Sequence, residues 1–295
     1  MEKKSVKRLL INVNGGGYFP VCLMRRWAIA ALVIGLMTGC SSDNDEPRVM
    51  EPTEVTLTFS PYTMEAMTRT ATSIASIVTH LDVWVVNGSD IIASHTTSAD
   101  EGFGTVNMTL DKTKTYTLYA MAHKADGATL TDGVISFTDD KLTHSMFYST
   151  TFSPATNTSL SCLMKRIVSD FRLDVTDDVP SDVKKFRFTI SDIYDRWNVI
   201  NGGTHQLDRV SVITYPNNAT PVFNIYSINN DAQTLHTVTV EALDADDGVI
   251  QTRTFTDVPL RNGYKTTYRG SFFIDAAFTS SYIVNDWNEY ETVDF

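Results

Sequence analysis

The sequence predicts an all-β protein in which two antiparallel β-sandwich domains follow one another along the chain. Three observations support this fold class. Hydrophobic and polar residues alternate with a period of two over many short runs, Asn-Gly and Asp-Gly pairs lie between the runs, and no stretch beyond residue 39 sustains helical spacing. The chain has 295 residues and 42% of them are hydrophobic, which suits two domains of ordinary size and is too apolar for intrinsic disorder.

The first predicted strand covers residues 55–59, where Val55, Leu57 and Phe59 alternate with polar residues. Because successive side chains of a strand point to opposite faces of the sheet, this pattern buries one face and leaves the other in water. The same alternation predicts strands at residues 81–85, 115–122, 170–175, 185–190 and 237–242, and turns are predicted at Asn87-Gly88, Asp126-Gly127, Asp132-Gly133, Asn201-Gly202-Gly203, Asp247-Gly248 and Asn262-Gly263.

The boundary between the two sandwiches is predicted in the polar stretch Ser153–Ser159, which separates the two groups of strands. This boundary gives an N-terminal sandwich at residues 53–155 and a C-terminal sandwich at residues 156–295. No internal repeat of fixed period is found in the sequence.

The N-terminus has the features of an export signal. Residues 27–37 form an uncharged apolar run behind Arg25 and Arg26, and a helix of this length spans about 16 Å, well short of the ~30 Å hydrocarbon core of a bilayer. A charged segment, a short apolar run and small residues are typical of a secretory signal. We therefore predict a signal peptide at residues 1–39, in which Met24 would make a better start.

The apolar run ends in Leu36-Met37-Thr38-Gly39-Cys40, which resembles the lipobox of bacterial lipoproteins. The resemblance implies that the Cys40 thiol receives a diacylglycerol, that the signal peptide is cleaved between Gly39 and Cys40, and that the new amino group is acylated. Several acyl chains hold a protein on a bilayer far more stably than one chain does. An ordinary signal peptide followed by a coincidental cysteine is the alternative.

After this cleavage the chain would be strongly acidic. Removal of residues 1–39 takes away six basic residues and one acidic residue, which leaves 18 basic against 34 acidic side chains and a formal net charge of −16. A nucleic-acid partner is not expected, because clustered Lys and Arg are lacking. Residues 40–52 are predicted to be a lipidated acidic tether. Within them, Ser41–Pro47 resembles the acidic export signal of surface lipoproteins of Bacteroidetes, and a plain solvated linker is the alternative.

Candidate catalytic and metal-binding residues are few. The six histidines lack metal-ligand spacing, and no nucleophile, phosphate-binding or dinucleotide motif occurs, so we predict a protein that is not an enzyme and that has no catalytic residues, metal ligands or cofactor. Asp244–Gly248 has the carboxylate spacing of a calcium loop but lacks its downstream Glu, and an acidic hairpin turn is favoured. Cys162 is left without a partner and is predicted to be a buried, inert thiol.

Aromatic residues of the C-terminal half could form a platform for a sugar, although such a density is ordinary in the cores and edges of β-sandwiches. A platform would make the protein a glycan-binding surface lipoprotein, and Trp197→Ala or Trp287→Ala would then remove binding. The residues are Tyr194, Trp197, Tyr264, Tyr268, Tyr282, Trp287 and Tyr290.

Two sequence segments of the C-terminal half, called phrases below, are the most typical of a known protein family. They are residues 164–175 (MKRIVSDFRLDV) and 258–270 (VPLRNGYKTTYRG). Together with the lipobox at Cys40, they resemble the FimB/Mfa2 family of fimbrial anchor proteins. The resemblance implies two transthyretin-like (Greek-key) β-sandwiches on a surface-exposed outer-membrane lipoprotein of Bacteroidetes. Such a protein seats the base of a fimbrium by β-strand contacts with stalk or accessory subunits, and outer-membrane lipid holds it through Cys40.

The physical basis of such contacts is an unpaired sheet edge or an open groove, where a strand from another subunit satisfies backbone groups and apolar pockets. Candidate segments are Val55–Phe59, Tyr282–Val284 and Tyr290–Phe295. For any single segment, completion of its own sandwich is the favoured interpretation.

A protease-processed stalk or tip subunit is the main alternative to an anchor. Stalk subunits of the same superfamily lose their lipid when a protease cuts after an arginine, and Arg69 could serve as such a site. Cleavage there would leave Thr70 as the N-terminus and would make the chain a polymerising subunit or adhesin. The C-terminal phrases favour the anchor.

Overall fold

Strands make up nearly all of the regular structure, as the alternation predicts. The computed structural model describes residues 50–62, 73–216, 219–274 and 281–286, the last range for the backbone alone. The helical elements in these ranges are two short 3₁₀ helices, η2 (Ile74–Ser76) and η3 (Thr138–Asp140). No helix among the described residues is long and apolar enough to cross a membrane.

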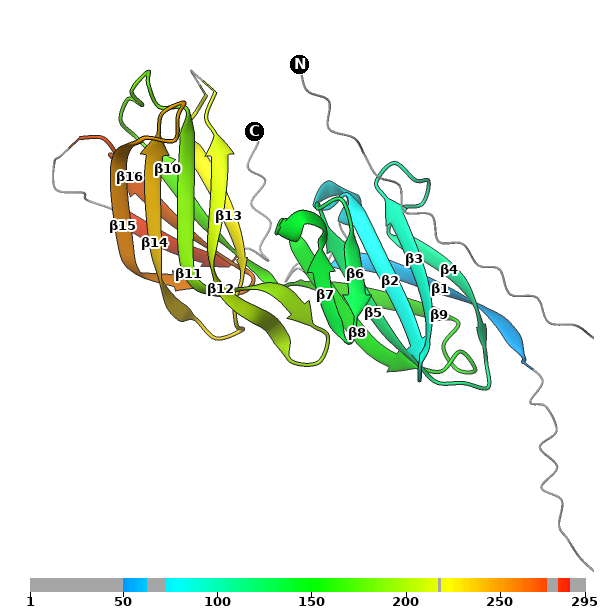
Figure 1. The fold of residues 1–295 in the computed structure, drawn as a ribbon. Helices are drawn as coiled ribbons and strands as arrows, with labels where there is room; N and C mark the ends of the chain where they lie inside the picture. The colour runs from blue at the N-terminus through cyan, green and yellow to red at the C-terminus, as the bar shows by residue number, and fades with distance from the viewer. Residues whose placement is uncertain (1–49, 63–72, 217–218, 275–280, 287–295) are drawn as a thin grey trace, which may run out of the picture. The chain divides into compact units, whose positions relative to one another are not determined.

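The N-terminal strands form a sandwich of two layers (Figure 1). The strands in this part of the chain are β1 (Pro52–Pro61), β2 (His80–Asn87), β3 (Asp90–Thr97), β4 (Thr105–Asp111), β5 (Tyr116–His123), β6 (Ala128–Thr131), β7 (Val134–Phe137), β8 (Ser145–Phe152) and β9 (Ser159–Arg166), and all but β6 and β7 belong to the sandwich. One layer has the order β3-β2-β5-β8 and the other β9-β1-β4, and two residue pairs between β8 and β9 join them into a seven-stranded sheet. The first core lies between the layers and includes the fully buried Leu57, Leu81 and Leu118.

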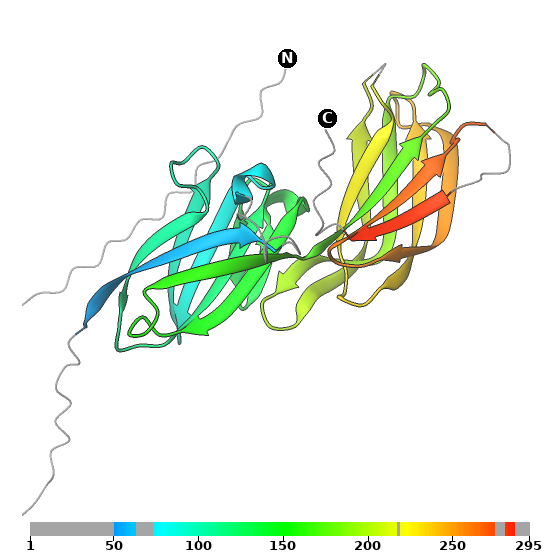
Figure 2. The ribbon, with the colours of Figure 1, turned by 180° about the vertical axis from the view of Figure 1, so that it is seen from behind.

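The C-terminal strands form a second sandwich (Figure 2). Its strands are β10 (Val168–Val175), β11 (Lys185–Asn198), β12 (Gly202–Thr214), β13 (Val222–Ile228), β14 (Thr234–Leu243), β15 (Val249–Leu260), β16 (Tyr264–Gly270) and β17 (Ser281–Asp286). The orders are β15-β14-β11-β12 in one layer and β13-β10-β16-β17 in the other. The second core is rich in phenylalanine: the Phe186 ring lies 4.5 Å from that of Phe223 and 5.8 Å from that of Phe272, between centroids.

The two sandwiches have the same strand order. In each, the first strand (β1 or β10) pairs in parallel with a late strand (β9 or β16) and antiparallel with β4 or β13. The next two strands form a hairpin, β2 with β3 in the first sandwich and β11 with β12 in the second. The other edge of β2 pairs with β5, which pairs with β8, and the other edge of β11 pairs with β14, which pairs with β15. The hairpin β6–β7 is an insertion in the first sandwich and β17 is an addition to the second.

The predicted fold class, all-β with two tandem sandwiches, is confirmed. Every strand predicted from alternation coincides with an observed strand, and each predicted Asn-Gly or Asp-Gly turn lies at or between strand ends. The strands concerned are β1, β2, β5, β10, β11 and β14.

The chain changes from one sandwich to the other later than the sequence suggested. Residues 156–295 were predicted to form the second sandwich, but β9 pairs with β1 and β8, and Cys162 and Met164 lie in the first core. The polar stretch Ser153–Ser159 is the turn between β8 and β9, where the Ser153 carbonyl accepts two backbone hydrogen bonds. The connection between the sandwiches is the single buried residue Ile167, which has no polar signature.

A third core forms outside both sandwiches. The inserted β6–β7 hairpin packs on the outward-facing side chains of β2 and β5 and on those of the β11–β12 hairpin. Backbone pairing supports this contact, because β7 pairs with β11 through Ile135 opposite Trp197. The buried members of the third core are Trp84, Met121, Ala125, Ile135, Phe137, Leu142, Ile167, Val168, Val199 and Ile228.

Substitution of Phe186 by Ala tests the second core. We expect a loss of about 3–5 kcal/mol in the free energy of unfolding, because the change removes a fully buried ring and leaves a cavity among other rings. Urea unfolding followed by circular dichroism measures it. As a control, Val212→Ala on exposed β12 should change stability by less than about 0.5 kcal/mol. Similar losses in the two variants would contradict the assigned core.

Candidate functional site

The predicted lipidation site lies outside the described residues. Gly39 and Cys40 belong to residues 1–49, and Arg69 belongs to residues 63–72. The signal cleavage, the lipid on Cys40 and the cut after Arg69 therefore stay predictions.

The segment Val55–Phe59 completes its own sandwich. It forms the middle of β1, which pairs along one edge with β4 and along the other with β9, and its apolar side chains are buried. The segment Tyr282–Val284 lies in β17, which pairs antiparallel with β16. The third candidate strand, Tyr290–Phe295, lies outside the described residues.

The aromatic residues proposed as a sugar platform belong, where described, to packed regions of the protein. Trp197 and Tyr194 pack against the third core, and Tyr268 is buried in the second core. Tyr264 lies beneath the Arg261 guanidinium, whose Cζ is 4.3 Å from the ring centroid. For these residues the structure supports a packing role over sugar stacking. The side chains of Tyr282, Trp287 and Tyr290 are outside the described residues.

The acidic segment Asp244–Gly248 is the turn between β14 and β15, as predicted. Asp244 Oδ1 accepts hydrogen bonds from the backbone N–H groups of Asp246 and Gly248 at 2.9 and 2.8 Å. Lys185 Nζ lies 2.7 Å from Asp247 Oδ1. Across the described ranges, no group of three or more His, Cys, Asp or Glu side chains is arranged to hold a metal ion.

Cys162 is a buried free thiol, which confirms the prediction for this residue. Burial raises its pKa to about 12. The thiol therefore stays protonated and unreactive at neutral pH.

The two phrases that carry the family resemblance lie side by side. Residues 164–175 contain β10 and residues 258–270 contain β16, and these two strands pair in parallel. Asn262 exchanges two hydrogen bonds with the backbone of Asn229, at 2.8 and 2.7 Å, and the Asn229 side chain donates to Ser169 Oγ at 2.7 Å. This buried network joins β10 to the end of β13 and to the turn between β15 and β16, so these contacts of the two phrases are structural.

Ionisable side chains are buried where β9 leads into β10. Burial raises the pKa of Asp170 to about 7, although Lys265 Nζ, 3.9 Å from Asp170 Oδ2, opposes this shift. Arg166 Nη1 lies 2.8 Å from His144 Nδ1. Burial first, and then the charge of Arg166, lowers the pKa of His144 to about 3. The imidazole of His144 is therefore neutral and accepts a hydrogen bond from Arg166.

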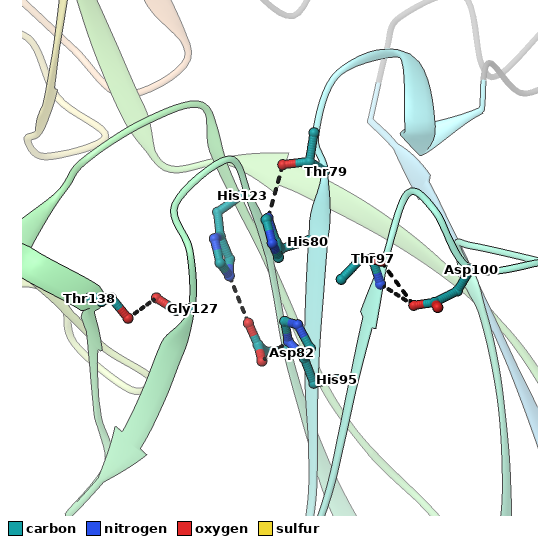
Figure 3. A network of polar contacts seen from close by, with 9 residues as sticks. All are labelled: Thr79, His80, Asp82, His95, Thr97, Asp100, His123, Gly127 and Thr138. Atoms are coloured by element: carbon teal, nitrogen blue, oxygen red, sulfur yellow. Dashed lines mark hydrogen bonds and ion pairs between the residues drawn. The ribbon is translucent and has the colours of Figure 1, made fainter.

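Three imidazoles surround one carboxylate on the outward face of the first sandwich (Figure 3). This histidine cluster consists of His80 and Asp82 on β2, His95 on β3 and His123 on β5. Asp82 Oδ2 lies 2.6 Å from His123 Nε2, and Asp82 Oδ1 lies 2.7 Å from His95 Nδ1. Because an ionised carboxylate only accepts, both imidazoles donate an N–H to it. His80 Nδ1 lies 2.9 Å from Thr79 Oγ1.

The cluster is tightly packed. The His80 and His123 rings are stacked, with centroids 5.5 Å apart and an interplanar angle of 9°, and the His80 and His95 centroids are 5.6 Å apart. The side chain of His123 is fully buried, and its Nδ1 atom has no hydrogen-bond partner among the described residues. Burial lowers the pKa of His80, and the imidazoles of His123 and His95 lower it further.

Sequence reasoning missed this cluster, because it sought ligands within a few residues of one another. Strand register brings its members together instead: His80 is opposite His123, and Asp82 is opposite His95. One signal was present in the sequence. His80 and Asp82 are two residues apart in the run around Leu81 and so share the face that Leu81 does not occupy.

The outermost strands β3 and β12 are candidate interaction surfaces. They occupy the same position in the two sandwiches, and within the described part of the chain each pairs along one edge only. Neither contains Lys or Pro, which often protect sheet edges. Both present exposed apolar side chains: Ile91 and Ile92 are 53% and 40% exposed, and Val210 and Val212 are 56% and 55% exposed.

Comparison with known proteins finds similarity in structure alone. No protein-family model matches the sequence, and no curated protein matches it. The fold is shared with a proposed cell adhesion protein from Bacteroides uniformis, at 16% identity, a TM-score of 0.50 and coverage of 79% of this chain and 99% of that chain.

Two further solved structures are similar at lower scores. A proposed cell adhesion protein from Bacteroides ovatus has 15% identity and a TM-score of 0.44, with 81% of this chain and 99% of that chain covered. The fimbrial anchor protein Mfa2 from Porphyromonas gingivalis has 11% identity and a TM-score of 0.44, with 80% and 98% covered.

His144 should make folding sensitive to acid. Its pKa is lowered on folding, so the unfolded chain binds the proton first, and the stabilisation present above about pH 6.5 is lost as the pH falls. We expect the wild type to lose about 3 kcal/mol relative to His144→Gln between pH 6.5 and pH 4. Urea unfolding at several pH values measures this difference.

The comparison of wild type with His144→Gln also removes the opposing contribution of Asp170 to the pH dependence of stability. The pKa of Asp170 is raised, so the folded state takes up a proton there as the pH falls below about 7 and gains stability. Both chains carry Asp170, and its contribution cancels. A difference between wild type and His144→Gln that does not vary with pH would show that His144 is not held neutral.

Proposed function

We propose that this chain is a cell-surface adhesion or fimbrial protein that binds other proteins and does not catalyse a reaction. The observation that carries the proposal is the pair of sandwiches with one strand order, a fold shared with the proposed cell adhesion protein of Bacteroides uniformis. One fold can serve many functions, and surface features of this chain also support the proposal.

The sheet edges support a binding role. β12 extends over 13 residues with one unpaired edge among the described residues, and β3 occupies the equivalent position. An unpaired edge presents backbone donors and acceptors to an incoming strand, and exposed β-branched side chains add apolar contact. The exposed valines of β12 and isoleucines of β3 supply such contact.

The finer proposal is a lipid-anchored subunit that seats the base of a fimbrium in the outer membrane. The lipobox ending at Cys40 and the two family phrases support it. Acyl chains on Cys40 would hold the protein in outer-membrane lipid. Its partners would be stalk or accessory subunits of the fimbrium, bound by β-strand contacts.

Replacement of Cys40 by Ala tests the anchor. We expect the variant protein and the fimbriae to move from the outer-membrane fraction into the medium, because the acyl chains can no longer be attached. Fractionation, immunoblotting and electron microscopy measure the shift. The matched control is Cys22→Ala, which changes a cysteine of the predicted signal peptide and leaves the lipobox intact.

Mass spectrometry of the wild-type N-terminus separates the alternatives. Acyl chains on Cys40 support the anchor. An N-terminus at Thr70 in surface material would assign the chain to the stalk or tip of the fimbrium. An unmodified Cys40 thiol on a protein that stays in the membrane fraction would refute lipid anchoring.

A further inference from the structure

The histidine cluster lies at the base of the inserted β6–β7 hairpin. His123 is the last residue of β5, directly before the segment that leads into β6. Phe137, at the end of β7, packs edge-on against the His123 ring, with centroids 5.5 Å apart. Thr138 donates its backbone N–H to the Gly127 carbonyl at 3.0 Å, and its hydroxyl lies 3.3 Å from the same carbonyl oxygen (Figure 3), so Thr138 ties the two ends of the hairpin together. Both ends of the insertion therefore meet at the cluster.

The hairpin in turn contacts the second sandwich. β7 pairs with β11, and the Val199 N–H donates to the Gly133 carbonyl at 2.9 Å. Arg209 of β12 donates to the Asp140 carbonyl at 3.0 Å. Trp84 and Met121 of the first sandwich and Val199 of the second are buried in the same third core. The hairpin thus joins the two sandwiches through backbone pairing and apolar contact.

The charges around the cluster limit how many protons it can hold. Asp82 is its central anion, Asp126 lies near His80, and Asp100 lies near His95. One protonated imidazole forms an ion pair with Asp82. When His80 and either His95 or His123 are both protonated, like charges lie on rings whose centroids are 5.5–5.6 Å apart. A protonated His123 would also carry the Nδ1 proton in a buried position without an acceptor among the described residues. The unfolded chain has no such cost, so acid favours opening of the cluster.

We infer that the histidine cluster is an acid-sensitive switch for the contact between the sandwiches. When more than one imidazole is protonated, the β6–β7 hairpin separates from β2 and β5 and releases the β11–β12 hairpin. The lowered pKa of His80 agrees in direction, because the closed cluster resists further protons. Imidazoles suit this role, since their protonation falls between about pH 5 and 8.

Hydrogen–deuterium exchange on the purified full-length protein tests the switch. Between pH 7.5 and pH 5.5, after correction for the intrinsic rate, we expect protection to fall about tenfold in residues 128–137 and 196–203. Protection in β14 should fall by less than in residues 128–137, because local opening leaves the second core intact. An equal loss in β14 would mean global unfolding and would overturn the inference.

Variants with opposite expected shifts make the test specific. His80→Gln combined with His95→Gln leaves one imidazole beside Asp82, and we expect the transition to move down by about one pH unit or to disappear. Asp82→Asn removes the anion that offsets the charge of the first protonated imidazole, and we expect the transition to move to higher pH. An unchanged midpoint in either variant would overturn the inference, and if one variant fails to fold, the other decides.

Two controls test whether His205 or His144 causes the transition. His205→Gln is the matched control, because His205 Nδ1 lies 2.7 Å from the buried carboxylate of Asp195, much as His95 lies beside Asp82. His144→Gln removes the separate acid sensitivity of His144. Both variants should keep the wild-type midpoint for residues 128–137. A shift in either control equal to that of the double variant would assign the transition to another site.

Discussion

The fold depends on the first strand of each sandwich being paired on both sides. β1 lies between β9 and β4, and β10 lies between β16 and β13. Neither layer is complete until its earliest strand has met a strand made about one hundred residues later, so these are contacts of high sequence separation. The same arrangement explains why Val55–Phe59 is unsuited to pair with a strand of another subunit. Its backbone groups already pair with β4 and β9, and its apolar side chains are buried in the first core.

The third core explains how a one-residue connection can join two sandwiches. Ile167 alone separates β9 from β10, and it is buried with Val168 against side chains from both sandwiches. The β6–β7 insertion supplies the remaining contact. This contact combines apolar burial with the histidine cluster, and the switch inferred above makes its stability depend on pH.

Sequence reasoning found the fold class because alternation reports which side chains are buried, as in Val55, Leu57 and Phe59. It misplaced the boundary because a polar stretch marks a turn whether or not a domain ends there, and the true connection at Ile167 is apolar. It did not find the histidine cluster because alternation gives the face of each strand and not its register with its neighbours. The exposure of Val210 and Val212 could not be predicted for the same reason, because alternation does not distinguish an edge strand from an interior strand.

The central place of β1 has a mechanical consequence. The chain enters β1 at Pro52, and tension applied there would act along the strand. The ladders to β4 and β9 run parallel to that force, so their hydrogen bonds would have to shear together and could not open one at a time. A sandwich pulled from this end would resist extension far better than one pulled from an outer strand such as β3, which could peel away pair by pair.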